Sequence, residues 1–195
     1  MVSPVRPLLA SALLLAALTA QAGADSSAQP VQITLGEPSA AVHKALGQFD
    51  VLSQYGGPPN SPTETFLASG LDIQFLRGAV ETIGVRHTSP PMGLASAQKA
   101  RQAVVSVKRV GAGDAVPISI GETAHAVHMA LGGFDRMEMF GPLGSQTESY
   151  FAAGLSIQYS QNKVAALTIM RFVLPNRRHT VKAKFKQAIV LVPGA

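Results

Sequence analysis

The sequence predicts an α+β protein built from two tandem repeats, each a short helix packed on a small antiparallel sheet. Three observations predict this class: an ordered internal duplication, one helix-like segment in each copy, and several strand-like segments after it. The 195 residues are 47% hydrophobic and only 14% charged, which supplies apolar material for a core and excludes wholesale disorder. The absence of cysteine excludes a disulfide framework, thiolate zinc sites, cysteine catalysis and lipid attachment through an N-terminal cysteine.

The first 22 residues are typical of a secretory signal peptide. Arg6 is the only charge before a run of mostly Leu and Ala over residues 8–20, and a small-x-small cleavage site ends at Ala22, with Ala24 as a second choice. The run is shorter than the ~20 apolar residues that a transmembrane anchor needs. We therefore expect cleavage, a soluble periplasmic or secreted protein, and a flexible leader over residues 23–30.

The charge that remains after cleavage is mildly basic. Without Arg6 the chain has 15 basic and 11 acidic groups, a net charge of +4. This is below the density of basic residues that a dedicated nucleic-acid-binding protein carries, so we expect no nucleic-acid partner.

The duplication aligns repeat module 1, residues 31–110, with repeat module 2, residues 116–195, and leaves residues 111–115 as the linker. The offset is 85, except for a central part where it is 84 because a loop is one residue shorter. The matches include Gly36-Glu37 with Gly121-Glu122, Ala41-Val42-His43 with Ala126-Val127-His128, Thr63-Glu64 with Thr147-Glu148, Gly70-Leu71 with Gly154-Leu155, and Gln102-Ala103 with Gln187-Ala188. So many ordered matches are not explained by chance.

A short helix is expected after the first strand of each copy. Ser39 and Thr123 are the expected N-caps, because a side-chain oxygen at that position accepts hydrogen bonds from unpaired backbone amides. Val42, Ala45 and Leu46 then fall on one face of the first helix. A glycine follows each helix at the position where a left-handed C-cap is expected.

Three strand-like runs and one later strand complete each copy. In the first copy they cover residues 63–68, 71–76, 80–85 and 103–107, and residues 188–192 are the counterpart of the last. The turn between the second and third runs is expected at Arg77-Gly78, and at Asn162-Lys163 in the second copy. Because about 80 residues give only a marginal core, we expect the two copies to pack together or to share a sheet.

The order of these elements, with a Gly-Leu-x-Ile-x-Phe segment at residues 70–75, resembles the β-lactamase-inhibitor-protein fold and the related small outer-membrane assembly lipoproteins. The resemblance implies a helical segment on a short antiparallel sheet in each module, with two modules in tandem as in the inhibitor. Unlike those families, this chain has no cysteine for disulfides or lipidation.

His43 and His128 occupy the same place in both copies and are the first candidates for a binding site. A histidine at the boundary of a helix's buried face usually packs its ring and hydrogen-bonds a neighbour. His125 and His128 together form a His-x-x-His pair that offers two metal ligands. The first copy has Ala40 in place of His125, and no third ligand is evident, so we predict no metal and no cofactor.

Acidic residues also recur in pairs, and paired carboxylates can serve acid–base catalysis. The pairs are Glu37 with Glu122, Asp50 with Asp135, and Glu64 with Glu148. Glu37 and Glu122 are explained as favourable charges at a helix N-terminus, and Asp50 and Asp135 suit the turn after the helix. No Gly-x-Ser-x-Gly, phosphate-binding or His-Glu-x-x-His motif occurs. We therefore expect no enzyme; a hydrolase using His128 with Glu148 or Asp135 is the weakest alternative.

A basic stretch without acidic residues lies near the C-terminus and provides the remaining candidate binding residues. They are Arg171, Arg177, Arg178, Lys182, Lys184 and Lys186. Two interpretations stand: a solvated edge strand whose lysines deter aggregation, or a docking patch for an acidic partner, anionic lipid or a cell-envelope polymer. The loops at residues 56–62 and 141–146 are a second candidate contact surface.

Together these features predict an exported, non-catalytic binding module that contacts a protein partner in the cell envelope, as an inhibitor- or immunity-type factor. The alternative is an envelope structural or assembly protein that contacts anionic lipid or a cell-wall polymer such as peptidoglycan. Tandem copies favour the first hypothesis because two copies make one extended surface.

Overall fold

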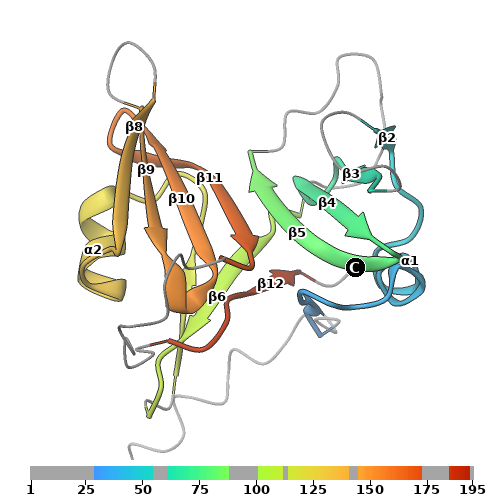
Figure 1. Ribbon diagram of the computed structural model, residues 1–195, viewed down its shortest axis with the longest axis horizontal. Helices are drawn as coiled ribbons and strands as arrows, with labels where there is room; N and C mark the ends of the chain where they lie inside the picture. Colours follow the sequence, from blue (N-terminus) through green and yellow to red (C-terminus); the bar gives the residue numbers. More distant parts are fainter. Residues whose placement is uncertain are drawn as a thin grey trace, which may run out of the picture.

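A computed structural model describes residues 29–54, 61–87, 101–111, 114–140, 145–172 and 185–193. Their main feature is an eight-stranded antiparallel sheet that runs across both copies (Figure 1). In spatial order its strands are β2 (Val51–Ser53), β3 (Thr63–Phe66), β4 (Leu71–Leu76), β5 (Ala79–Arg86), β11 (Lys163–Met170), β10 (Leu155–Ser160), β9 (Ser145–Tyr150) and β8 (Arg136–Phe140). The two copies meet where β5 pairs with β11.

A second, four-stranded sheet joins the first and last strands of the two copies. Its order is β1 (Val31–Ile33), β12 (Ile189–Val192), β6 (Val104–Lys108) and β7 (Ala115–Ile118). The first strand of copy one therefore pairs with the last strand of copy two, and the first strand of copy two pairs with the last strand of copy one. The two copies share both sheets.

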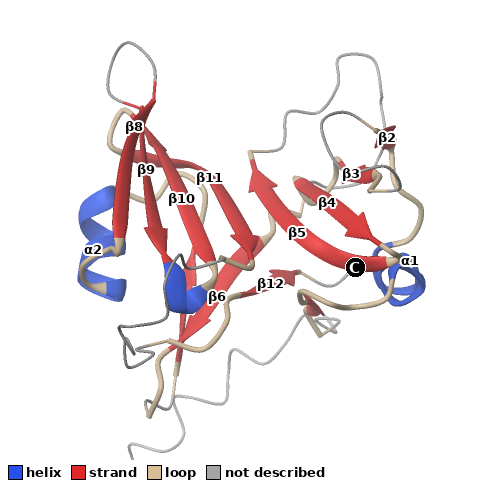
Figure 2. Ribbon diagram, in the orientation of Figure 1, coloured by secondary structure: helices blue, strands red, loops and turns tan. Residues whose placement is uncertain are grey.

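The predicted fold class, an α+β pair of repeats each with its own small sheet, is wrong. Of the described residues 51% lie in strands and 15% are helical, so the protein is mostly β (Figure 2). The physical reason is the exchange of first and last strands together with the β5–β11 pairing, which gives neither repeat a sheet of its own. Each α-helix is also only eight residues long.

The two α-helices are α1 (Ser39–Leu46) and α2 (Ala124–Leu131), and a 3-10 turn, η1 (Phe151–Ala153), follows β9. The Thr123 cap is confirmed, because its hydroxyl accepts a hydrogen bond from the Ala126 amide. The Ser39 cap is wrong: Ser39 is the first helical residue, and Pro38 precedes it without a side-chain cap. Of the predicted apolar face of α1, Val42 is buried, but Ala45 is exposed.

The glycines that end the helices are confirmed, but their conformation differs from the expected left-handed one. Gly47 has φ 85° and ψ −157°, and Gly132 has φ 80° and ψ −156°. This combination is essentially restricted to glycine. It turns the chain back sharply, so that the next strand starts at the outer end of the eight-stranded sheet.

Two edge strands and one turn differ from the sequence prediction. The edge strands β2 and β8 were not predicted. β2 is only three residues long, whereas the alternation of charged and apolar residues at Arg136, Met137, Glu138 and Met139 could have identified β8. The Arg77-Gly78 turn is confirmed. Its counterpart is one residue earlier than predicted, at Gln161-Asn162, and both of these residues have positive φ.

The buried side chains of both sheets and both helices form one hydrophobic core. In β4, Leu71, Ile73 and Phe75 point into this core, whereas Asp72 and Gln74 are half-exposed on the opposite face. Figure 1 shows α1 and α2 at opposite ends of the eight-stranded sheet, with β6 and β12 behind its middle. The helices and the four-stranded sheet thus cover the same face of the larger sheet.

We expect Gly154→Ala to lower the free energy of unfolding by ~2 kcal/mol or more, because Gly154 has φ 66° and an added Cβ would lie 2.7 Å from the Met170 carbonyl oxygen. The Met170 amide already donates a hydrogen bond to the Gly154 carbonyl at 2.8 Å, which holds the two segments together. Urea unfolding measures the loss.

Gly133→Ala is the matched control, because an added Cβ there meets no atom within 4 Å. It should change the free energy of unfolding by less than ~0.5 kcal/mol. Equal effects of the two substitutions would contradict the close approach at Gly154.

Candidate functional site

Each copy places a helix histidine against a strand glutamate of the eight-stranded sheet. His43 Nε2 in α1 lies 2.6 Å from Glu64 Oε2 in β3. His128 Nε2 in α2 lies 2.8 Å from Glu148 Oε2 and 2.9 Å from Glu148 Oε1 in β9. The members of each pair are 21 and 20 residues apart in the chain, so that only the packing of helix on sheet brings them together.

The two pairs have the same surroundings. Each carboxylate is buried, and each histidine ring is about 40% exposed. The His43 ring centroid lies 6.1 Å from those of Phe49 and Phe75. The His43 ring thus packs near two aromatic side chains while its Nε2 is fixed by the carboxylate. This arrangement orients the imidazole and ties the helix to the sheet.

In the second pair, the centroid of the His128 ring lies 6.0 Å from that of Phe134 and 6.4 Å from that of Tyr159. Phe134 is 38% exposed and Tyr159 is buried. The two copies therefore differ in the polarity of the aromatic group beneath the histidine: Tyr159 stands where the first copy has Phe75.

The second copy carries additional polar groups around its glutamate. Glu148 accepts hydrogen bonds from Gln146 Nε2 at 3.2 Å and from the Tyr150 hydroxyl at 3.3 Å. The corresponding residues of the first copy are Pro62 and Phe66, which offer no such donors. The second copy is therefore the one in which more polar groups surround the glutamate.

Burial raises the pKa of both tyrosines in this cluster well above the ordinary value, and repulsion from the nearby Glu148 carboxylate raises each pKa further. The Tyr159 hydroxyl is buried without a hydrogen-bond partner. Both phenols are therefore neutral at physiological pH, and the Tyr150 phenol donates its hydrogen bond to the Glu148 carboxylate.

The other recurring acids close local turns. Glu37 Oε2 accepts a hydrogen bond from the Thr34 amide, and Glu122 Oε1 accepts one from the Ser119 amide. Both acids lie one residue before a helix N-cap, Pro38 or Thr123, and neither helix has an acidic residue within its first turn.

Asp50 and Asp135 lie directly after the helices, as predicted. Asp50 Oδ2 accepts a hydrogen bond from the Leu67 amide, and Asp135 Oδ2 accepts one from the Phe151 amide. Each carboxylate thus joins the turn after the helix to the end of the next long strand.

The His, Asp and Glu side chains of the described residues do not form a metal-binding cluster. Among the described residues, no group of three or more His, Asp or Glu side chains is arranged to hold a metal ion. His125 is exposed on α2, three residues before His128.

The predicted basic patch is described only at its two ends. Arg171 is exposed directly after β11, and its guanidinium lies beside Gly36 of the first copy. Lys186 is exposed, and its amide donates to the Lys108 carbonyl. Arg177, Arg178, Lys182 and Lys184 lie outside the described residues, as do the predicted signal peptide and most of the loops at residues 56–62 and 141–146.

Sequence reasoning did not identify the open face, which we define as the face of the eight-stranded sheet away from the core. One transverse row crosses all eight strands through directly opposed residues: Val51, Thr65, Asp72, Gly84, Thr168, Ser156, Ser149 and Arg136. Thr168 and Ser156 lie in the second copy at its centre. The period-2 alternation in the sequence indicated such polar positions, but not that they form one row.

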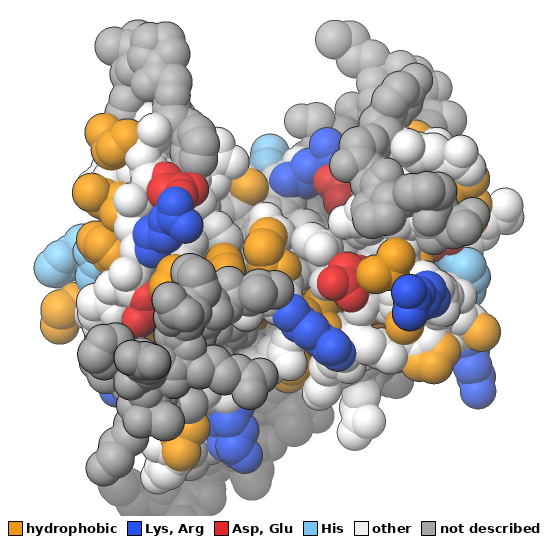
Figure 3. Space-filling model, viewed as in Figure 1, with side chains coloured by type: hydrophobic (Ala, Val, Ile, Leu, Met, Phe, Trp, Pro, Cys, Tyr) orange, Lys and Arg blue, Asp and Glu red, His pale blue; other side chains and the backbone are white. Residues whose placement is uncertain are grey.

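Two ion pairs lie on the open face. Arg86 Nε lies 2.8 Å from Asp72 Oδ2, and Arg136 forms an ion pair with Glu138. In Figure 3, which looks onto this face, white and orange side chains predominate among the described residues, with a few red and blue ones between them. The open face is thus broad and carries few charges.

No protein family, curated protein or solved structure was found to match this chain. Within the described residues, no helix has both the length and the apolar character needed to cross a membrane.

We expect Glu148→Ala to lower the free energy of unfolding by ~3 kcal/mol, because it leaves three hydrogen-bond donors without their acceptor. Glu64→Ala should lower it by only ~1 kcal/mol, because it leaves one such donor. Denaturant unfolding monitored by circular dichroism checks the order. Equal losses would show that the extra donors of the second copy contribute nothing to stability.

Tyr159→Phe should leave stability at neutral pH unchanged or raise it, because the substitution removes a buried hydroxyl that has no partner. Tyr150→Phe is the matched control and should cost ~1 kcal/mol, because its hydroxyl donates to Glu148. A larger loss for Tyr159→Phe than for Tyr150→Phe would contradict this assignment.

The raised tyrosine pKa values also predict an alkaline loss of stability. The unfolded chain releases these protons near pH ~10, whereas the folded protein holds them to higher pH. The stabilising contribution is therefore complete below pH ~10 and is lost as the pH rises above it. The unfolding free energy of the double variant Tyr150→Phe/Tyr159→Phe should fall less steeply above pH ~10 than that of the wild type; parallel curves would contradict it.

Proposed function

We propose that this protein is an exported, non-catalytic binding module that contacts a protein partner in the cell envelope, as an inhibitor- or immunity-type factor. The observation that carries the proposal is the open face, which extends over eight strands and both copies. In the described part of the chain, both helices and the four-stranded sheet lie on the other side.

The size of the open face supports a protein partner rather than a small ligand. Seven spacings of ~4.8 Å between neighbouring strands give a width of ~34 Å. A standard protein–protein interface buries ~800 Å² on each partner, which a surface of this width can supply. Duplication provides this width, because each copy contributes four neighbouring strands of the sheet.

The chemistry of the open face supports a contact based on shape and hydrogen bonding. Its centre consists of Gly84, Thr168 and Ser156, whose small side chains let another surface approach the sheet closely. The Ser and Thr hydroxyls both donate and accept hydrogen bonds. The Asp72–Arg86 ion pair limits the charge that a partner must desolvate.

The histidine–glutamate pairs support a structural role rather than catalysis. The same pair, with two aromatic rings near the imidazole at equivalent positions, occurs in both copies although the first lacks the tyrosine hydroxyls. Both carboxylates are buried beneath a helix. A contact that joins each helix to its strands accounts for this repetition.

The proposal is tested by capturing the tagged protein from the envelope fraction of its native host at low and moderate salt. Thr168→Arg and Ser156→Arg each place a long cation at the centre of the open face and should abolish capture of a stoichiometric protein partner. Ala126→Arg is the matched control, because it adds the same side chain at an exposed position of α2, and it should retain the partner.

A partner that survives both open-face substitutions would contradict the proposed surface. Retention of anionic lipid or peptidoglycan with no protein partner would contradict the binding-module proposal and favour an envelope structural protein.

A further inference from the structure

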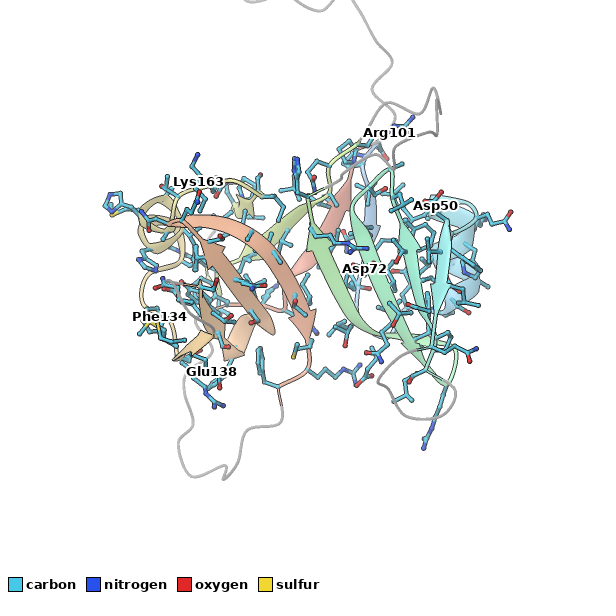
Figure 4. The ribbon with its side chains drawn as sticks, turned by 90° about the horizontal axis from the view of Figure 1, so that it is seen from above. Asp50, Asp72, Arg101, Phe134, Glu138 and Lys163 are labelled. Atoms are coloured by element: carbon cyan, nitrogen blue, oxygen red, sulfur yellow. The ribbon has the colours of Figure 1, made fainter. Side chains whose placement is uncertain are left out.

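The outer edge of β8 carries an unusual concentration of exposed apolar side chains. Met137 is 48% and Met139 66% exposed, and both lie on the inner face of the sheet, since they pair with Glu148 and Gln146 of β9. Phe134, just before the strand, is 38% exposed, and Met129 of α2 is 73% exposed. We call these four residues the β8 apolar edge. Figure 4 shows Phe134 and Glu138 together at this end of the sheet, opposite Asp50.

The β8 edge is open to a further strand. Within the described residues, β8 pairs with β9 alone and ends the eight-stranded sheet. Natural sheets usually protect such an edge with short strands, charged side chains or proline. β8 has five residues and no lysine or proline, and its two charged side chains, Arg136 and Glu138, form an ion pair with each other.

The equivalent edge in the first copy is shorter and lacks two of the four apolar residues, although Val51 and Leu52 of β2 are also exposed, at 47% and 49%. The strand β2 has three residues instead of five. The counterparts of Met129 and Met139 in the first copy are Lys44 and Gln54, both polar. Leu52 corresponds to Met137 and is equally exposed, at 49%. Duplication alone therefore does not explain the β8 apolar edge.

The charges of β8 are complementary to a second copy of the same strand. Arg136 and Glu138 lie two residues apart on the open face, with Met137 between them on the inner face. Two antiparallel strands related by a two-fold axis perpendicular to the sheet oppose residues of the same face. An axis at Met137 sets Arg136 against the partner's Glu138, and Glu138 against the partner's Arg136.

Neighbouring registers are disfavoured by the same charges. An axis at Glu138 would oppose the two Glu138 side chains directly, and an axis at Arg136 would oppose the two Arg136 side chains. Like charges directly opposite each other destabilise a strand pair. Only the register centred on Met137 pairs both charges. It also sets Met137 directly against the partner's Met137, with Met139 diagonal to that residue.

We propose that β8 is the interface of a two-fold homodimer, in which β8 of one copy pairs antiparallel with β8 of the other about Met137 and joins the two eight-stranded sheets edge to edge. The β8 apolar edge is covered by its own counterpart in this assembly. The inference is independent of the partner proposed for the open face, which stays exposed in the dimer.

Cysteine crosslinking tests the register directly, because the chain has no cysteine of its own. Residues that oppose each other in a strand pair have Cβ atoms about 5 Å apart, so purified Met137→Cys protein should form a covalent dimer with a short thiol-reactive crosslinker. Leu52→Cys is the matched control, equally exposed at the equivalent position of β2, and should stay monomeric.

Charge reversal tests the ion pairs across the interface. Sedimentation equilibrium up to ~500 µM covers the range of a weak, transient interface. Arg136→Glu should weaken dimerisation at least ~10-fold, and Arg136→Glu/Glu138→Arg should restore it, because the reversed pair is again self-complementary. Circular dichroism confirms that each variant is folded.

Three results would overturn the proposal: a wild-type monomer over the whole concentration range, equal crosslinking of the two cysteine variants, or a dimer that Arg136→Glu does not weaken. A dimer restored by the double reversal and crosslinked at Met137→Cys alone would establish it.

Discussion

The pairing of β5 with β11 is the interaction on which the rest of the architecture depends. Five residue pairs, from Thr82 with Met170 to Arg86 with Ala166, join the inner edges of the two copies. Without this pairing, both inner strands would leave rows of backbone donors and acceptors unpaired next to the core. The pairing also aligns the open-face residues of the two copies, and it leaves β2 and β8 as the outer edges.

The pairing of first strands with last strands between the two copies forms the second, four-stranded sheet. Because β1 pairs with β12 and β7 with β6, the four-stranded sheet closes the core beneath the junction of the two copies. Contacts between the beginning and the end of the chain are costly to form, since a long loop must close first. They make the two copies one cooperative unit around a shared core.

The two histidine–glutamate pairs show what duplication keeps and what it changes. Both copies keep the ring between two aromatic groups and the buried carboxylate, because removing either partner of such a pair leaves a polar group unsatisfied. The second copy adds Tyr150 and Gln146 as donors to Glu148, which satisfies a more deeply buried carboxylate. Tyr159, like Tyr150, stands where the first copy has phenylalanine, but its buried hydroxyl has no hydrogen-bond partner.

The sequence by itself determined the duplication, the helices, the strands at residues 71–76 and 103–107, and the paired positions of His43 and His128, since these follow from local periodicity and from identity at a fixed offset. It did not determine the fold class, the histidine–glutamate contacts or the open face. Backbone hydrogen-bonding groups are nearly the same at every residue, so the sequence of a strand does not determine which other strand it pairs with. Only the tertiary structure decided that β5 pairs with β11 and β1 with β12. Each copy alone would have a marginal core, and both copies bury their apolar faces by forming joint sheets around one shared core.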